Sequence, residues 1–214
     1  MNGNNMKTVY IYLFDTFSDW EIGYVLELFS WQNKLPAPSF QVRTVGAEKR
    51  AYRSLCGVTV LPDCVLNEID ECQMAALLLP GGYRWGEAEN APVLDLAQSC
   101  LQKGVVVGAI CGATLALAER GCLNDRAHTS NMPEYLLSAK AYTGQARYAA
   151  QKATRDKNLV TAGAAGGLEW AKLIAQALSA YPQEALENWY RYYASANAEY
   201  FLKFVSYIQS QAKN

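Results

Sequence analysis

Continuous apolar runs alternate along this chain with segments in which apolar residues recur at helical spacing. The runs at 9–14, 75–79 and 105–110 predict buried strands of a parallel sheet, and the alternating segment 40–45 predicts a second strand. Helices are predicted over 20–31, 92–103, 115–120, 133–140 and 168–180. This order is typical of a doubly wound α/β fold, so we expect a three-layer α/β/α sandwich with a mostly parallel sheet.

Two further regions extend this pattern. Residues 57–61 predict a hairpin or an excursion off the main sheet, and residues 151–161 predict a hairpin around a turn at 156–158. After Pro182, an aromatic stripe at helical spacing predicts helices to about residue 210 that pack into the core or form a dimer surface. We therefore expect a single domain over residues 1–214, with a C-terminal helical extension at about 182–210.

Composition narrows the class of protein. The chain has 214 residues and a net charge of −1, which argues against nucleic acid or an anionic membrane as the main partner. No apolar run approaches the ~20 residues that span a bilayer, and the polar start lacks a signal-peptide core, so we expect a cytoplasmic protein. Six cysteines without C-x-x-C spacing and one histidine predict free thiols and no metal site.

The most informative stretch is the corner at Cys111. The run at 105–110 passes there directly into a helix, which is the geometry of a nucleophile elbow. Free N–H groups at the helix start favour a thiolate, so the sequence predicts a lowered pKa for Cys111. Because Gly112 has no Cβ atom, the chain can pass close to this corner without a steric clash. The alternative is a small core cysteine.

Two other segments carry candidate chemistry. Pro80, Gly81 and Gly82 follow a predicted strand, so they form a turn at the sheet edge whose N–H groups could serve as oxyanion donors; a plain turn is the alternative. Glu21 lies three residues after Ser18, which is the spacing of a capping box. From its position alone, Glu21 is interpreted as a helix cap or a charge near the helix dipole.

Together these pieces resemble a known family. Over residues 7–180 the chain resembles the ThiJ/PfpI family of the class I glutamine amidotransferase-like superfamily. The segments that carry the resemblance are Glu21, Pro80–Gly81–Gly82, Ala109–Ile110–Cys111–Gly112, and Thr161–Ala162–Gly163 followed by Leu168–Glu169. The resemblance implies a flavodoxin-like sandwich, Cys111 as nucleophile, Glu21 in contact with its sulfur, and oxyanion N–H groups at Gly82 and Gly112. It also implies a homodimer and no cofactor.

The chain departs from the family at one position. Many members have a histidine after the elbow, where this chain has Asn131, and the single histidine, His128, lies three residues earlier. Side chains alternate along a strand, so if Asn131 points at Cys111, His128 should point away. Asn131 is then a candidate for orienting substrate. His128 is the one candidate for a catalytic base, with a satisfied core histidine as the alternative.

These residues predict a cysteine-nucleophile hydrolase, an intracellular protease of the ThiJ/PfpI type acting on a small-molecule or peptide substrate. The alternatives are a glyoxalase or protein deglycase acting on reactive dicarbonyls, and a non-enzymatic redox sensor or chaperone with an oxidisable cysteine. A thiolate beside Glu21 would raise the pKa of that carboxyl group by like charge. Tyr83, Trp85 and Tyr142 are candidates for the pocket wall.

Overall fold

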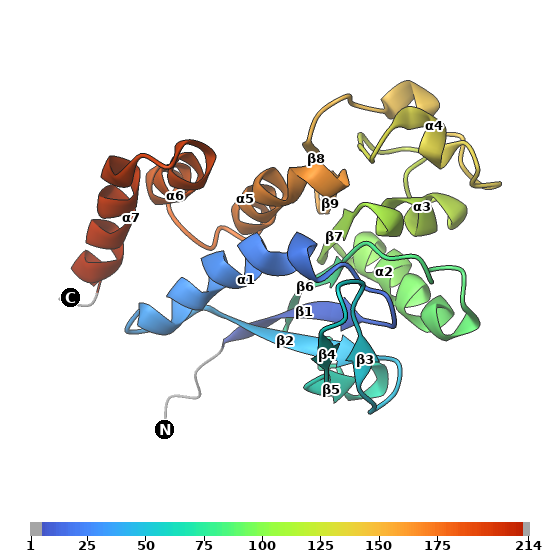
Figure 1. The fold of residues 1–214 in the computed structure, drawn as a ribbon, viewed down its shortest axis with the longest axis horizontal. Coiled ribbons are helices and arrows are strands. Elements are labelled where there is room, and N and C mark those ends of the chain that lie inside the picture. The colour runs from blue at the N-terminus through green and yellow to red at the C-terminus, as the bar shows by residue number, and fades with distance from the viewer. Residues whose placement is uncertain (1–5, 212–214) are drawn as a thin grey trace.

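A seven-stranded sheet forms the centre of the molecule in the computed structural model, which describes residues 6–211 (Figure 1). Six strands are parallel, and only the edge strand β8 is antiparallel to its neighbour. The central strands are buried along almost their whole length, as the apolar runs predict. From edge to edge the strands are β5 (Cys64–Val65), β2 (Phe40–Gly46), β1 (Lys7–Leu13), β6 (Met74–Leu79), β7 (Val106–Ile110), β9 (Leu159–Ala162) and β8 (Ala153–Asp156).

Helices flank this sheet and complete the predicted three-layer α/β/α sandwich. Helices α1 (Gly23–Ser30) and α5 (Gly167–Ala177) pack against each other, and α2 (Ala91–Lys103) packs against β7. Helix α3 (Gly112–Glu119) starts where β7 ends, and α4 (Pro133–Leu136) packs on α3. The predicted fold class is therefore confirmed.

The two predicted hairpins are present. Strands β3 (Tyr52–Arg53) and β4 (Thr59–Val60) form a separate antiparallel sheet, and β8 and β9 enclose the turn at 157–158. The short strand β5 lies in a segment for which the hydrophobic pattern predicts no strand. The 3₁₀ turns are Asp19–Ile22, Trp31–Lys34, Leu66–Glu68, Ala88–Asn90, Gln145–Arg147 and Ala164–Gly166.

Three local predictions need correction. The predicted helix at 20–31 is a 3₁₀ turn followed by α1, and Ser18 makes no side-chain cap, so the capping box is wrong. The predicted helix at 133–140 is limited to the single turn of α4. Residues 126–130, which we expected to be extended, form only an isolated bridge, between His128 and Tyr148.

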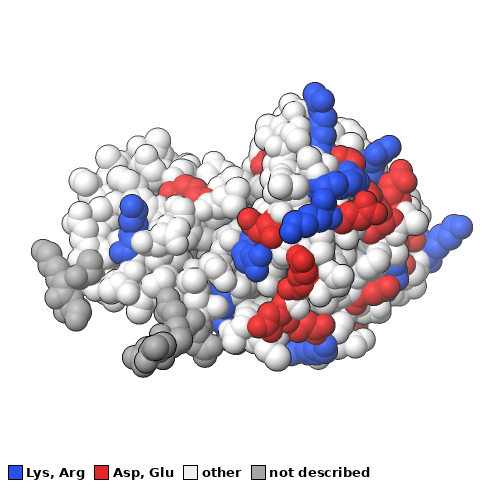
Figure 2. Space-filling model, turned by 90° about the horizontal axis from the view of Figure 1, so that it is seen from below, with Lys and Arg blue, Asp and Glu red and all other residues white. Residues whose placement is uncertain are grey.

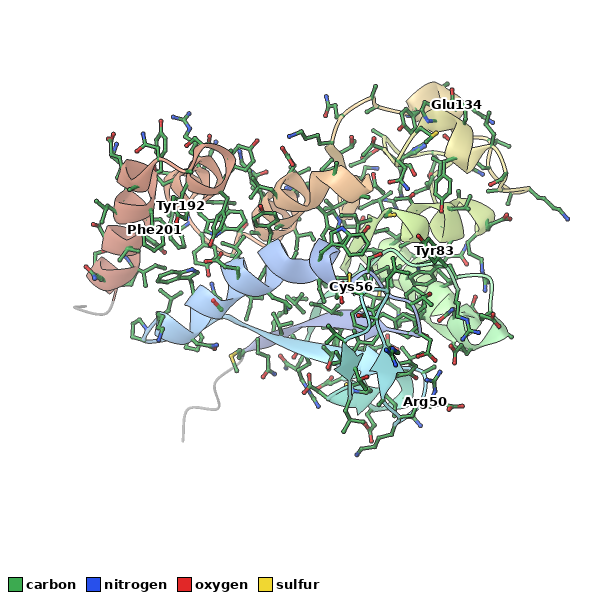
Figure 3. All side chains as sticks on the ribbon, in the orientation of Figure 1. Arg50, Cys56, Tyr83, Glu134, Tyr192 and Phe201 are labelled. Carbon is green, nitrogen blue, oxygen red and sulfur yellow. The ribbon has the colours of Figure 1, made fainter. Side chains whose placement is uncertain are left out.

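Helices α6 (Gln183–Ser195) and α7 (Ala198–Gln211) lie at one end of the molecule (Figure 1). Their aromatic stripe packs inward: Trp189 and Phe204 are buried, and the rings of Tyr192 and Phe201, labelled in Figure 3, lie 4.8 Å apart. None of the helices described is long and apolar enough to cross a membrane. Figure 2 shows acidic and basic side chains intermixed on one face of the molecule.

Candidate active site

Cys111 lies at the predicted corner between β7 and α3. Its backbone has φ 56° and ψ −120°, a conformation that residues other than glycine rarely adopt. Its N–H donates to the carbonyl of Ala162 at 2.9 Å, and its side chain is only partly buried. The corner has the geometry of a nucleophile elbow, and the alternative of a fully buried core cysteine is wrong.

Glu21 is a buried carboxyl group rather than a helix cap. Only 1% of the residue is exposed, and Oε2 accepts the N–H of Gly81 at 2.7 Å. Its other oxygen, Oε1, makes no hydrogen bond to any residue in the described range 6–211. A buried polar atom without a partner is costly, so its presence points to a role beyond stability.

Glu21 and Cys111 both lie against Gly81. A Cβ atom at this glycine would lie 2.5 Å and 2.9 Å from the two carboxylate oxygens of Glu21 and 2.8 Å from Cβ of Cys111. Both side chains therefore contact the same small space, and only a glycine fits between them. The resemblance predicted this neighbourhood of Glu21 and Cys111.

Burial dominates the electrostatics of this pair. It raises the pKa of Glu21, opposed by the Gly81 N–H, so the predicted direction is right but its main cause is burial and not like charge. Burial also raises the pKa of Cys111; the Asn131 amide lowers it, and the charge of Glu21 raises it again. The expected lowering of the thiol pKa is therefore wrong.

Asn131 fixes the position of the sulfur. Its Nδ2 donates to Sγ of Cys111 at 3.4 Å, and its Oδ1 accepts the N–H of Ala164 at 2.8 Å. Because the second contact sets the orientation of the amide, Nδ2 faces the thiol. The structure thus gives Asn131 a contact to the sulfur, whereas the sequence suggested a contact to substrate.

His128 faces away from this site, as the alternation argument predicted. The residue is 0% exposed; its Nδ1 contacts the carbonyl oxygen of Arg126 at 2.8 Å and its Nε2 contacts the hydroxyl of Tyr142 at 2.7 Å. Burial lowers the pKa of the imidazole. Both ring nitrogens are engaged elsewhere, so the candidate role of His128 as a base for Cys111 gains no support, and the core interpretation fits its contacts.

The two predicted oxyanion glycines lie against each other. A Cβ atom at Gly112 would lie 2.5 Å from the carbonyl oxygen and 3.2 Å from the nitrogen of Gly82. Gly82 itself has φ 155°, and a Cβ there would lie 2.6 Å from both the Phe14 ring and the carbonyl oxygen of Thr16. This close backbone approach requires glycine at both positions. The oxyanion role of their N–H groups stays a prediction.

A cavity of about 440 Å³ adjoins these glycines, and Tyr83 and Trp85 line it, as we expected. Tyr142 does not line it but packs on His128, so its predicted pocket role is wrong. Sequence reasoning missed Tyr135, whose pKa is raised by burial and then by the charges of Cys111 and Glu21. Nothing in the sequence distinguishes Tyr135 from other tyrosines on short helices.

The other thiols and metal-binding side chains add no second centre. All six cysteines are free. Within residues 6–211 no three His, Cys, Asp or Glu side chains gather in a way that could hold a metal ion.

We expect Asn131→Ala to raise the pKa of the Cys111 thiol by about one unit, because a hydrogen bond to a charged group contributes about 1.5–3 kcal/mol and one unit is about 1.4 kcal/mol. The measurement is the pH dependence of iodoacetamide alkylation, followed by mass spectrometry on the peptide that contains Cys111. Tyr148→Phe, which removes a nearby hydroxyl bonded to the Ser130 carbonyl, serves as control. An unchanged alkylation profile in Asn131→Ala would contradict the assignment.

Comparison with known proteins agrees with the geometry. The sequence pattern of the DJ-1/PfpI family matches residues 7–177. A Bacillus subtilis protein named "Uncharacterized protease YoaZ" is 38% identical over 205 residues, covering 94% of this chain and 98% of its own. The fold is similar to a ThiJ/PfpI family protein from Bacillus anthracis, with a TM-score of 0.85, 34% identity and coverage of 94% and 97% of the two chains. It is also similar to the DJ-1 superfamily protein Atu0886 from Agrobacterium tumefaciens, with a TM-score of 0.76, 27% identity and coverage of 90% and 100%. The chain belongs to the DJ-1/PfpI family.

Proposed function

We propose that this protein is a cysteine hydrolase that cleaves peptide-type carbonyl compounds through Cys111, with Glu21 as the group that moves protons. The observation that carries the proposal is the contact of the partly exposed Cys111 thiol with the buried carboxyl group of Glu21, whose Oε1 has no other partner within residues 6–211. Burial raises the pKa of this carboxyl group, which is the direction required of a group that exchanges protons with a thiol. The protease name of the relative from Bacillus subtilis supports the same reaction class.

The reaction follows from these positions. The thiol proton moves to Glu21 as Sγ of Cys111 forms a bond to the carbonyl carbon, and the carbonyl electrons shift to oxygen. The N–H groups of Gly82 and Gly112 would stabilise that oxygen. Collapse breaks the carbon–nitrogen bond, and the amine leaves with the proton from Glu21. Water then attacks the thioester, and its protons go to the regenerated thiol and, through Glu21, to the acid product.

The rate should be low. A dedicated general base typically contributes about 10²–10⁴-fold, and His128 is engaged elsewhere. The raised pKa of Cys111 further reduces the fraction of thiolate at neutral pH. The same raised pKa disfavours the redox-sensor alternative, because peroxide reacts with thiolate.

The test is to trap the acyl-enzyme. The protein is mixed with excess peptide ester, quenched in acid and digested, and the peptide that contains Cys111 should carry the acyl mass. Cys56→Ser serves as control, because Cys56 is an exposed thiol that could react without catalysis. Turnover without any acyl group on Cys111, or no turnover at all, would count against the hydrolase.

The dicarbonyl alternative is favoured by the same free oxygen of Glu21. Isomerisation of a dicarbonyl bound to the sulfur needs a base that moves a proton between two carbon atoms, and Oε1 is available for this step. Loss of methylglyoxal that is equal in the wild type and Glu21→Gln would remove this alternative.

A further inference from the structure

The cavity of about 440 Å³ next to Gly82 and Gly112, which neither Cys111 nor Glu21 lines directly, has the size of a binding pocket for a small group, since such pockets measure about 300–1,000 Å³. Gly82 and Gly112 form part of its wall, and residues of the segment 83–88 and of α2, α3 and α4 contribute to the rest. The cavity therefore begins where the oxygen of a bound carbonyl group would lie. A group attached to the carbonyl carbon can extend directly into it.

Apolar side chains form one part of the cavity wall. Trp85, Leu94, Leu115 and Ala116 contribute to it. Trp85 is held on two sides: its Nε1 donates to the Pro80 carbonyl at 3.1 Å, and its ring centre lies 4.6 Å from that of Phe14. Since the indole N–H is already used, Trp85 offers the cavity a wall without a free hydrogen-bonding group.

The charged side chains of the cavity already have partners. Two of the three form ion pairs within the protein, and Glu119, which accepts only a backbone N–H, remains an anion that would repel an acidic group, so an uncharged group fits best. The contacts are Arg120 with Asp95, Glu87 with Arg84 at 3.8 Å, and Glu119 with the N–H of Lys140 at 3.2 Å.

Two tyrosines supply the remaining polar groups. Tyr135 is half-buried, and its hydroxyl makes no hydrogen bond to another residue within 6–211. Tyr83, labelled in Figure 3, is 82% exposed at the edge of the cavity. A phenol is neutral at physiological pH and can donate to an amide oxygen of a ligand.

We propose that this cavity binds a large, uncharged apolar side chain on the acyl side of the substrate, so that the preferred substrates carry phenylalanine- or leucine-like groups next to the carbonyl that Cys111 attacks. That this side chain lies on the acyl side of the substrate rests on the proposed function. The affinity of the cavity for such a side chain does not depend on it. Tyr135 positions the adjacent amide of the substrate.

Two matched esters test the specificity. N-acetyl-phenylalanine and N-acetyl-glycine 4-nitrophenyl esters share one leaving group, and Cys111→Ala gives the background rate. We expect kcat/KM to favour the phenylalanine ester by at least about tenfold, since apolar groups in such pockets contribute about 10–200-fold. Ala91→Phe, at a half-buried position in the wall, should abolish this preference; Gln98→Phe, at an exposed position on the same helix, should not. Equal rates for the two esters in the wild type would overturn the proposal.

A binding experiment separates the pocket from the catalysis. N-acetyl-phenylalaninamide, which cannot acylate the enzyme, should slow iodoacetamide alkylation of Cys111, whereas N-acetyl-glycinamide should not; both are read on the peptide that contains Cys111. Protection by the phenylalanine amide without ester turnover would retain the pocket and reject the hydrolase. Ester turnover with equal protection by both amides would retain the hydrolase and reject the pocket.

Discussion

Replacing Cys111 by glycine should raise the free energy of unfolding by about 1 kcal/mol and abolish hydrolysis. Cys111 has φ 56°, and strained backbone of this kind costs about 1–3 kcal/mol in a residue other than glycine. The greater backbone entropy of unfolded glycine offsets about 0.5–1 kcal/mol of the gain. Urea unfolding measures the change in stability, and release of a fluorogenic peptide measures the activity.

Cys111→Ala is the matched control for strain. It removes the sulfur but keeps a Cβ atom, so it should be inactive without the gain in stability. If the glycine variant unfolds at the same or lower urea concentration than the alanine variant, the corner stores no strain. If either variant keeps hydrolysing the peptide, Cys111 is not the nucleophile.

Glu21→Gln should lower hydrolysis by about 10²–10⁴-fold, because an amide cannot transfer the proton. The amide oxygen can still accept the Gly81 N–H, so the turn around Gly81 should persist. The thiol should change in the opposite direction: without the carboxylate charge, the pKa of Cys111 falls and alkylation at neutral pH becomes faster. A slower hydrolase with a faster-reacting thiol distinguishes a lost proton carrier from a damaged site.

The same variant should change how stability depends on pH. Because burial raises the pKa of Glu21, the folded state binds this proton more tightly than the unfolded state does. That contribution to stability is complete below the unfolded pKa of about 4.3 and is lost as the pH rises through the folded pKa. Glu21→Gln should lack this loss, whereas Glu134→Gln, at an exposed position on α4 (Figure 3), should retain it. Parallel stability profiles for the wild type and Glu21→Gln would contradict the burial effect.

The parts of the molecule that local sequence determines were predictable. Long apolar runs predict β1, β6 and β7, because strands buried on both faces of a parallel sheet are apolar along their length. The end of the third run predicts the corner at Cys111. The two-residue strand β5 is too short to carry such a pattern. The alternation of side chains along a strand predicts that Asn131 and His128 point in opposite directions. The two side chains do so, although this segment forms only an isolated bridge between His128 and Tyr148.

The chemistry of the site was harder to predict, because it depends on residues distant in sequence. Ser18 and Glu21 have the spacing of a cap, but the carboxyl group turns to the Gly81 N–H, sixty residues away. Burial and the nearby carboxyl group raise the pKa of Cys111, whereas the Asn131 amide and the Gly112 N–H lower it. Only the folded structure shows which of these effects is larger. The role of Tyr142 as the partner of His128 likewise depends on tertiary contacts.

The single glycine at position 81 also limits how this site could be redesigned. A methyl group at this position would lie 2.5 Å from the Glu21 carboxylate and 2.8 Å from Cβ of Cys111, so this side of the site cannot be reshaped through residue 81. The opposite wall, formed by α2 and α3, is built of side chains such as Leu115 that can be shortened without touching the reacting pair. Engineering of substrate size should therefore proceed through those helices, with the turn after β6 left unchanged.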